Sequence, residues 1–156
     1  MTNVSNAIHG LLLPVYGTML LPHATVAEVI AYSHTESVSR APVWLTGMLS
    51  WRGEKIPLIF FESICGEPLP DTESKRQKIA VLKTLGADPA MPFIALVVQG
   101  IPRTIKIDIE ELTDDTGHES AQPFIARYVR VKGQSAYIPN MDSLEDAIKR
   151  VLVTIN

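Results

Sequence analysis

The chain contains a single cysteine, Cys65, among its 156 residues. One thiol can form neither an internal disulfide nor a thiolate cluster that holds a metal ion within the chain. Such cysteine usage is typical of proteins in reducing compartments. We therefore expect a cytoplasmic protein. Cys65 stands inside an apolar run, and we expect it to be a small buried side chain.

A strong charge of either sign is also missing. The formal net charge is −3, and the densest basic run, Lys75-Arg76 with Lys78, stands close to acidic residues. Nucleic-acid binding usually needs a clustered basic face. The composition therefore argues against a nucleic-acid partner, and residues 67–78 are expected to be a solvated linker or loop.

The chain lacks a long apolar run and a basic start. Its most apolar stretch, residues 11–22, is shorter than the ~20 residues of a membrane span and is interrupted by Pro14. Residues 1–10 are polar and lack the pattern of a signal peptide. We expect residues 1–10 to be a flexible tail, and we expect no direct insertion into a membrane.

Patterns that support catalysis or metal binding are sparse, and no glycine-rich phosphate loop is present. An alternative function, a small-barrel enzyme, would use His34 with Glu36 or the acidic run of residues 110–115. Leu112 stands where a calcium loop needs an oxygen ligand, so a solvated loop is the better interpretation of that run. The sequence predicts no enzyme, cofactor or metal. The histidines lack the spacing of a metal site: His9, His23, His34 and His118.

The chain does contain many short strand-forming runs separated by glycine and proline. Its length and its 46% hydrophobic residues suit one domain over residues 1–156. We detect no reliable internal repeat. A helical turn leading into a strand is expected over residues 24–32, and a short helix is expected to end at Gly66. Strands are predicted over residues 11–15, 18–21, 48–51, 55–61, 79–85, 93–98, 104–109, 126–132 and 135–138.

One convincing helix is predicted, at the C-terminal end. Leu144, Ile148 and Leu152 fall on one helical face. Asp142 and Glu145 have the spacing of a capping box. Many short strands with one terminal helix predict a mainly β domain of barrel type.

Residues 41–61 are the most informative segment. Two β-prone runs flank a predicted turn in which Gly53 can adopt a positive φ. The segment contains Pro42, Gly47, Trp51-Arg52-Gly53 and Ile56-Pro57-Leu58-Ile59. This pattern resembles the signature of the CheW-like domain family. The run Val26-Ala27-Glu28-Val29 resembles a second segment of that family.

The resemblance implies two small five-stranded SH3-like barrels packed together, with a C-terminal helix. It also implies a non-catalytic adaptor that couples chemoreceptors to a sensor histidine kinase in bacterial chemosensory signalling. The expected partners are the regulatory domain of the kinase and the cytoplasmic tip of a chemoreceptor. The residues that carry over to a partner-binding site are Val26, Glu28, Gly47, Arg52 and Gly53.

Some positions depart from the family pattern. Trp51 stands where Leu usually precedes Arg-Gly, and the family's Asp is replaced within Phe60-Phe61-Glu62. A Val-Asp pair is also missing at residues 99–102. These departures suggest a divergent member of the family. By analogy alone, we expect a member of the ChpC type, which would serve type IV pili and twitching motility.

The expected site residues also have structural interpretations. Arg52 could bind a partner carboxylate bidentately, or it could tie its own loop through backbone carbonyls. Glu28 could be an ordinary surface carboxylate. In an extended segment, Val26 and Glu28 would share one face, as suits an interface with an apolar centre and a charged rim. Trp51 is expected in the core, and the apolar hairpin predicts that the lobes meet near residues 47–57.

Overall fold

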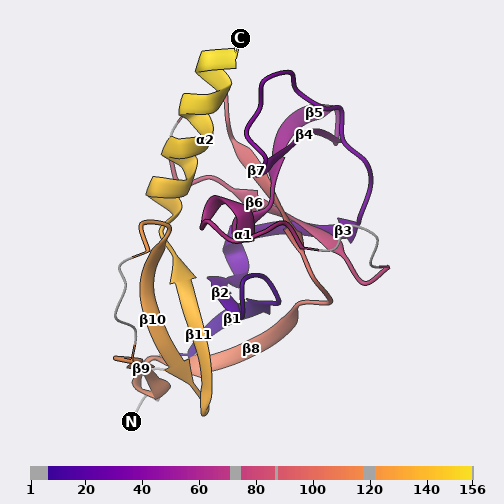
Figure 1. Cartoon of the computed structure of the whole chain (residues 1–156). Coiled ribbons are helices and arrows are strands. Elements are labelled where there is room, and N and C mark those ends of the chain that lie inside the picture. Colours follow the sequence, from indigo (N-terminus) through magenta and orange to yellow (C-terminus); the bar gives the residue numbers. More distant parts are fainter. Residues whose placement is uncertain (1–6, 71–74, 87, 118–121, 156) are drawn as a thin grey trace.

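The computed structural model describes residues 7–70, 75–86, 88–117 and 122–155. The chain folds into two curved β-sheets with a long helix at the C-terminal end (Figure 1). The strands are β1 (Ala7–Leu13), β2 (Met19–Pro22), β3 (Val26–Ala31), β4 (Leu45–Trp51), β5 (Glu54–Ile59), β6 (Lys78–Lys83), β7 (Phe93–Val98), β8 (Arg103–Asp108), β9 (Leu112–Asp114), β10 (Ile125–Val131) and β11 (Gln134–Pro139). The helices are η1 (His23–Thr25), α1 (Phe61–Ile64), η2 (Ile109–Glu111) and α2 (Met141–Ile155).

The two sheets repeat one topology. The first lobe is the sheet β8-β1-β2-β11-β10-β9, and the second lobe is the sheet β3-β6-β7-β5-β4. In the first lobe, the antiparallel strands β8, β1 and β2 join the β10/β11 hairpin through a parallel pair of β2 with β11. In the second lobe, the antiparallel strands β3, β6 and β7 join the β4/β5 hairpin through a parallel pair of β7 with β5. Strand β9 extends the first sheet to six strands. The predicted two-barrel fold is confirmed, and the structure also reveals a repeat that we did not detect in the sequence.

The hairpins β4/β5 and β10/β11 match residue by residue. Both have an irregular register directly after their first residue, between Leu45 and Gly47 in β4 and between Ile125 and Arg127 in β10. The same turn leads into both strands. Leu45 N–H donates to the carbonyl of Pro42 over 3.0 Å, and Ile125 N–H donates to the carbonyl of Gln122 over 3.1 Å. The two lobes therefore share local backbone hydrogen bonding as well as strand order.

The tips of the two hairpins also match. Arg52 and Gly53 have φ values of 47° and 78°, and Lys132 and Gly133 have φ values of 48° and 80°. Two successive positive φ angles are typical of the type I′ turn, whose twist suits two antiparallel strands. The predicted positive φ of Gly53 is confirmed.

One shared core joins the lobes. It contains residues of β1, β2, β6 and β7, both hairpins and α2. The β4/β5 hairpin contributes Leu45 and Ile59 to this core, whereas Leu49 and Trp51 belong to a separate cluster inside the second lobe. The prediction that the lobes meet near residues 47–57 is therefore wrong. The side chains of a strand alternate between its two faces, so the middle of the hairpin fills its own barrel.

Helix α2 begins one residue earlier than its predicted cap. Asn140 precedes Met141, and its side-chain Oδ1 accepts a 3.1 Å hydrogen bond from the N–H of Ser143. Asp142 lies within the first helical turn. The predicted capping box with Asp142 is therefore wrong, because Asn140 already supplies the side-chain acceptor at this helix end.

Glu145, the other member of the predicted capping box, binds a loop. It is 3% exposed, and its carboxylate accepts the backbone N–H groups of Leu85 and Gly86 over 2.8 and 2.9 Å. Leu144 and Ile148 are fully buried in the shared core. Helix α2 thus joins the core to the loop that follows β6.

The structure changes the predicted bounds of three segments that the sequence assigned to a tail, a loop or a linker. Residues 7–10 form the start of β1, so the predicted tail is wrong there, while residues 1–6 lie outside the described residues. Residues 112–114 of the acidic run form β9, which pairs with β10. The predicted linker ends at β6, and its residues 71–74 are not described. Among the described residues, no helix has the length and apolar character needed to cross a membrane.

Candidate partner-binding site

Gly47 lies where another segment crosses β4. Met48 N–H donates to the carbonyl of Glu36 over 2.8 Å, and Glu36 N–H donates back to Met48 over 3.1 Å. A Cβ at Gly47 would collide with that Glu36 carbonyl and with the Thr35 side chain, and Gly47 has a φ of 149°. The structure therefore gives Gly47 a backbone role: it allows residues 35 and 36 to approach the strand.

Trp51, Arg52 and Glu28 form a group at the hairpin tip that we name the tip cluster. The Trp51 indole Nε1–H donates to Glu28 Oε1 over 2.8 Å. The Arg52 guanidinium lies over the Trp51 ring, with Cζ 4.8 Å from the ring centroid, and Arg52 Nη2 is 3.2 Å from the same Glu28 oxygen. The structure brings together two predicted site residues, Glu28 and Arg52. Trp51 was expected in the core, where it lies, and its indole also contacts both of them.

The tip cluster has a buried base and an exposed top. Trp51 is 7% exposed and packs edge to face on Phe93, with ring centroids 4.9 Å apart. The side chains of Glu28 and Arg52 are 37% and 65% exposed. Glu28 belongs to β3 and Trp51 to β4, the two edge strands of the second sheet. Their contact therefore bridges the sheet edges and closes the second barrel.

Val26 lies apart from the tip cluster. It pairs with Leu82 and packs against the shared core, whereas Glu28 binds Trp51 of the second-lobe cluster. The register of β3 shifts between Val26 and Glu28, so simple strand alternation does not hold there. The expectation that these two residues share one face is wrong.

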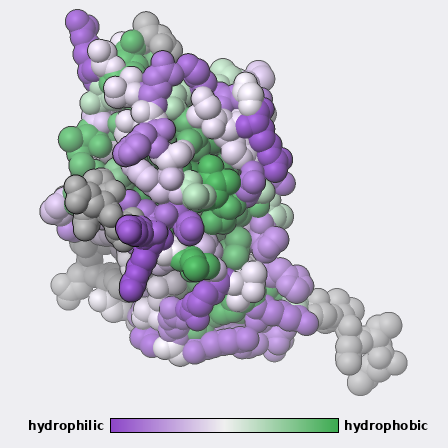
Figure 2. All heavy atoms as spheres, turned by 90° about the vertical axis from the view of Figure 1, so that its right-hand side faces the viewer, coloured by the Kyte–Doolittle hydropathy of each residue, from purple (hydrophilic) through white to green (hydrophobic). Residues whose placement is uncertain are grey.

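Figure 2 shows the molecule from the right-hand side of Figure 1, the side on which β3 lies. Apolar side chains gather in the middle of this face, and hydrophilic side chains surround them. Val29 of β3 is 37% exposed. An apolar centre with a polar rim is typical of protein interfaces.

The residues of the alternative enzyme have separate partners. Glu36 Oε2 accepts a 2.6 Å bond from Lys55 Nζ, and this bond lowers the pKa of the Glu36 carboxyl. The His34 ring contacts Tyr32 edge to face at 5.9 Å. A general base needs a nucleophile or substrate proton within hydrogen-bond reach. These contacts give no support to a catalytic role for His34 and Glu36.

The acidic run is also engaged in structural contacts. Asp114 accepts a 2.5 Å bond from Arg127 Nε, and Asp115 accepts a 3.2 Å bond from the Ser135 hydroxyl. Glu111 forms a capping box with Asp108. In the described segments, no group of three or more His, Cys, Asp or Glu residues is arranged to hold a metal ion. His118 lies outside these segments.

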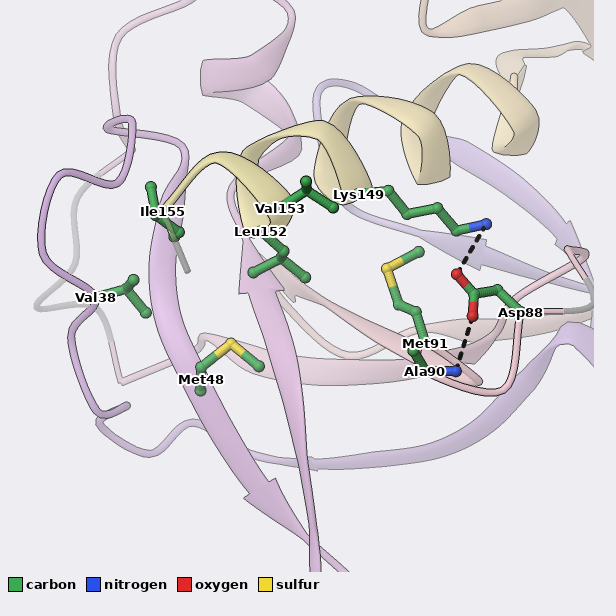
Figure 3. A pocket seen from close by; sticks show the side chains of 9 residues that line it. All are labelled: Val38, Met48, Asp88, Ala90, Met91, Lys149, Leu152, Val153 and Ile155. Carbon is green, nitrogen blue, oxygen red and sulfur yellow. Dashed lines mark hydrogen bonds and ion pairs between the residues drawn. The ribbon is translucent and has the colours of Figure 1, made fainter.

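A second surface feature, an apolar groove of about 410 Å³, lies beside the C-terminal half of α2 (Figure 3). Met48, Met91 and Leu152 are among its lining residues. At one end, Lys149 Nζ and Asp88 Oδ2 are 3.7 Å apart. None of the predicted site residues lines this groove.

Two equivalent barrels on one shared core define a protein of the tandem SH3-like barrel class. The sequence model of one family in this class, the CheW-like domain, matches residues 15–149. This match covers most of the chain, which therefore belongs to the CheW-like domain family.

The structure is similar to the crystal structure of the scaffolding protein TtCheW from Thermoanaerobacter tengcongensis. The TM-score is 0.71 and the sequence identity is 18%, over 86% of this chain and 84% of that chain. At this identity the similarity shows a common fold. No curated protein matches the chain.

Proposed function

We propose that this protein is a non-catalytic adaptor in bacterial chemosensory signalling, which couples chemoreceptors to a sensor histidine kinase. Family membership and the fold of a scaffolding protein support this function. The proposed partners are the regulatory domain of the kinase and the cytoplasmic tip of a chemoreceptor. The proposed location is the cytoplasm, at receptor arrays.

The observation that carries the proposal is the hairpin tip. The motif Trp51-Arg52-Gly53 forms a tight turn that exposes the Arg52 guanidinium above a buried ring. Tryptophan and arginine are enriched among the residues that contribute most to binding at protein interfaces. We assign the partner-binding surface to this tip and to β3, with Val26, Glu28, Gly47, Arg52 and Gly53 as its expected residues.

The finer assignment to type IV pili and twitching motility is also a proposal. The departures at Trp51 and within Phe60-Phe61-Glu62 indicate a divergent member, and the pilus pathway is assigned to it by analogy alone. A kinase and a receptor of a pilus pathway should then bind more tightly than their flagellar counterparts in the same cell.

The test uses the purified chain with the purified kinase regulatory domain and receptor cytoplasmic fragment of the source cell. Size-exclusion chromatography with light scattering should detect a complex with each partner. A mixture of all three should form a larger assembly. Failure of the chain to bind either partner would contradict the adaptor function.

A further inference from the structure

Each helix that follows a hairpin carries a buried glutamate that reaches the other lobe. Helix α1 follows the β4/β5 hairpin of the second lobe, and α2 follows the β10/β11 hairpin of the first lobe. Glu62 of α1 and Glu145 of α2 are 8% and 3% exposed. Glu62 lies against the β1/β2 turn of the first lobe, and Glu145 binds the β6/β7 loop of the second lobe. This turn and this loop are themselves matched, because each joins an equivalent pair of antiparallel strands.

The contact of Glu145 is complete, and we name it the α2 contact. Its Oε2 accepts the N–H of Leu85 over 2.8 Å, and its Oε1 accepts the N–H of Gly86 over 2.9 Å. A buried carboxylate is stable when both oxygens accept hydrogen bonds. The α2 contact therefore holds the β6/β7 loop firmly to the helix.

The contact of Glu62 is incomplete, and we name it the α1 contact. Oε1 is buried and has no hydrogen-bond partner among the described residues, while Oε2 accepts a long 3.4 Å bond from Gln99. The carboxyl also lies against the backbone N–H of Tyr16. No described lysine, arginine or histidine pairs with it. A buried charge that is only partly paired is unfavourable, so this carboxyl is more easily buried when it carries a proton.

Gln99 connects the Glu62 carboxyl to the backbone of both lobes. Gln99 follows β7 of the second lobe, and its N–H donates over 2.8 Å to the carbonyl of Pro14, which follows β1 of the first lobe. Its side-chain Oε1 accepts a 3.1 Å bond from Gln77 Nε2. The residue that holds Glu62 thus also makes a backbone hydrogen bond from one lobe to the other. A change at the carboxyl can therefore alter the contact between the lobes.

The other titratable groups around Glu62 are accounted for. Burial raises the pKa of Tyr16 in the first-lobe turn, of Tyr137 in β11 and of Cys65 at the end of α1, the last to about 12, so these groups stay neutral at physiological pH. Glu67 is exposed to solvent. Burial also raises the pKa of the Glu62 carboxyl above its usual value. Glu62 is thus the buried group of the α1 contact whose charge changes.

We propose that the α1 contact is a proton-dependent switch between the lobes, closed when Glu62 is neutral and open when Glu62 is charged, while the α2 contact stays closed. The charged carboxylate gains more from hydration than from the long bond to Gln99, so it favours separation of α1 from the first-lobe turn. A rise in pH therefore opens the α1 contact. This property belongs to the chain alone and does not depend on the proposed partners.

The experiment is amide hydrogen exchange of the purified chain, followed by NMR from about pH 5 to 8 and corrected for the intrinsic pH dependence of exchange. The Gln99 N–H reports on the α1 contact, and the N–H groups of Leu85 and Gly86 report on the α2 contact. Protection of Gln99 should fall at least about fivefold as the pH rises, while protection of Leu85 and Gly86 stays within about twofold. The midpoint should match the titration of the Glu62 carboxyl carbon.

Two variants separate Glu62 from its neighbour. Glu62→Gln keeps the shape of the side chain and cannot ionise, so protection of Gln99 should be high and independent of pH. Glu67→Gln is the matched control, because it removes the exposed carboxyl near the same helix end and should keep the pH profile of the wild type. Thermal melts confirm that both variants fold.

Three results would overturn the inference. The first is protection of Gln99 that does not change with pH in the wild type, or that falls equally in Glu62→Gln. The second is a parallel loss at Leu85 and Gly86, which would show that the whole chain loosens. The third is loss of the pH profile in Glu67→Gln, which would assign the effect to Glu67.

Discussion

The outer edge of the hairpin is covered differently in the two lobes. In the first lobe, β9 pairs with β10, and Asp115 N–H donates to the carbonyl of Tyr128 over 3.0 Å. At the matched position of the second lobe, Glu36 forms an isolated bridge with Met48 of β4. The hairpin therefore pairs with a short strand, β9, in the first lobe and forms a single bridge with Glu36 in the second lobe.

The matched strand residues that face these edge contacts, Gly47 and Arg127, have different roles. Gly47 in β4 makes room for the carbonyl of Glu36. Its counterpart Arg127 in β10 instead binds Asp114 of β9. The lobes thus share strand order and turn geometry, while their side chains are specialised. A side-chain contact that occurs in one lobe and is absent at the matched position of the other lobe is therefore a candidate feature of a binding site.

The largest expected effect concerns Gly47. A β-branched residue there meets the Glu36 carbonyl and an unfavourable φ, so Gly47→Val should lower the free energy of unfolding by about 3 kcal/mol or prevent folding. Arg127→Val, at the matched position, loses an exposed ion pair and should cost less than about 1 kcal/mol. Urea denaturation measures both. Equal losses would show that the two positions do not differ as described.

The two turns should respond alike to loss of glycine. Nothing lies within 4 Å of a Cβ built on Gly53 or Gly133, so only the positive φ opposes a side chain. Gly53→Val and Gly133→Val should each cost about 1 to 2 kcal/mol, measured by thermal melts. If one turn tolerates valine and the other does not, the equivalence of the two turns is wrong.

The first turn of the helix after each hairpin provides a pH test. Glu62 is 8% exposed, and burial raises the pKa of its carboxyl, whereas its counterpart Asp142 is exposed. Within the described residues, Glu62 Oε1 has no hydrogen-bond partner, and Oε2 accepts a long 3.4 Å bond from Gln99. Burial outweighs this bond and the backbone N–H groups of Tyr16 and Glu62, which favour the charged form, so the pKa of the Glu62 carboxyl is raised.

Because the pKa of Glu62 is raised in the folded state, its contribution to stability is complete below the unfolded pKa. That contribution is lost as the pH rises through the folded pKa. Glu62→Gln should remove this decline and stabilise the protein at pH 7 by about 1 kcal/mol. Thermal melts across about pH 4 to 8 measure it. Asp142→Asn is the control, and a decline in stability that persists in Glu62→Gln would contradict this account.

The smallest expected effect concerns Glu28. The sequence suggested an ordinary surface carboxylate, but Glu28 binds the indole of Trp51 in the partly buried tip cluster. Glu28→Gln keeps an acceptor there and should lower the free energy of unfolding by about 0.5 kcal/mol in chemical denaturation. An increase in stability would mean that the pair with Arg52 is unfavourable in the free protein.

The sequence predicted most of the strands because their apolar runs are bounded by glycine and proline. Strand β9 was missed because its three residues stand within an acidic run. The repeat was missed because matched positions carry unlike residues, such as Gly47 and Arg127. The two hairpins agree in backbone hydrogen bonds and φ angles, which composition does not reveal.

The candidate site was predicted in part. The family pattern identified Glu28 and Arg52, and the structure places them 3.2 Å apart. The role of Trp51 in holding them depends on a contact between residues far apart in the sequence, which strand patterns cannot supply. Its one signal was its own position, next to an arginine at a tight turn where the family usually has Leu.

The most direct test of the central claim compares the two turns while a partner is bound. Amide hydrogen exchange should be measured with and without the kinase regulatory domain, and then with the receptor fragment. The account predicts added protection at Glu28 and residues 51–54 with at least one partner, and none at residues 131–134. Protection at the first-lobe turn alone, or at neither turn while a complex forms, would contradict it.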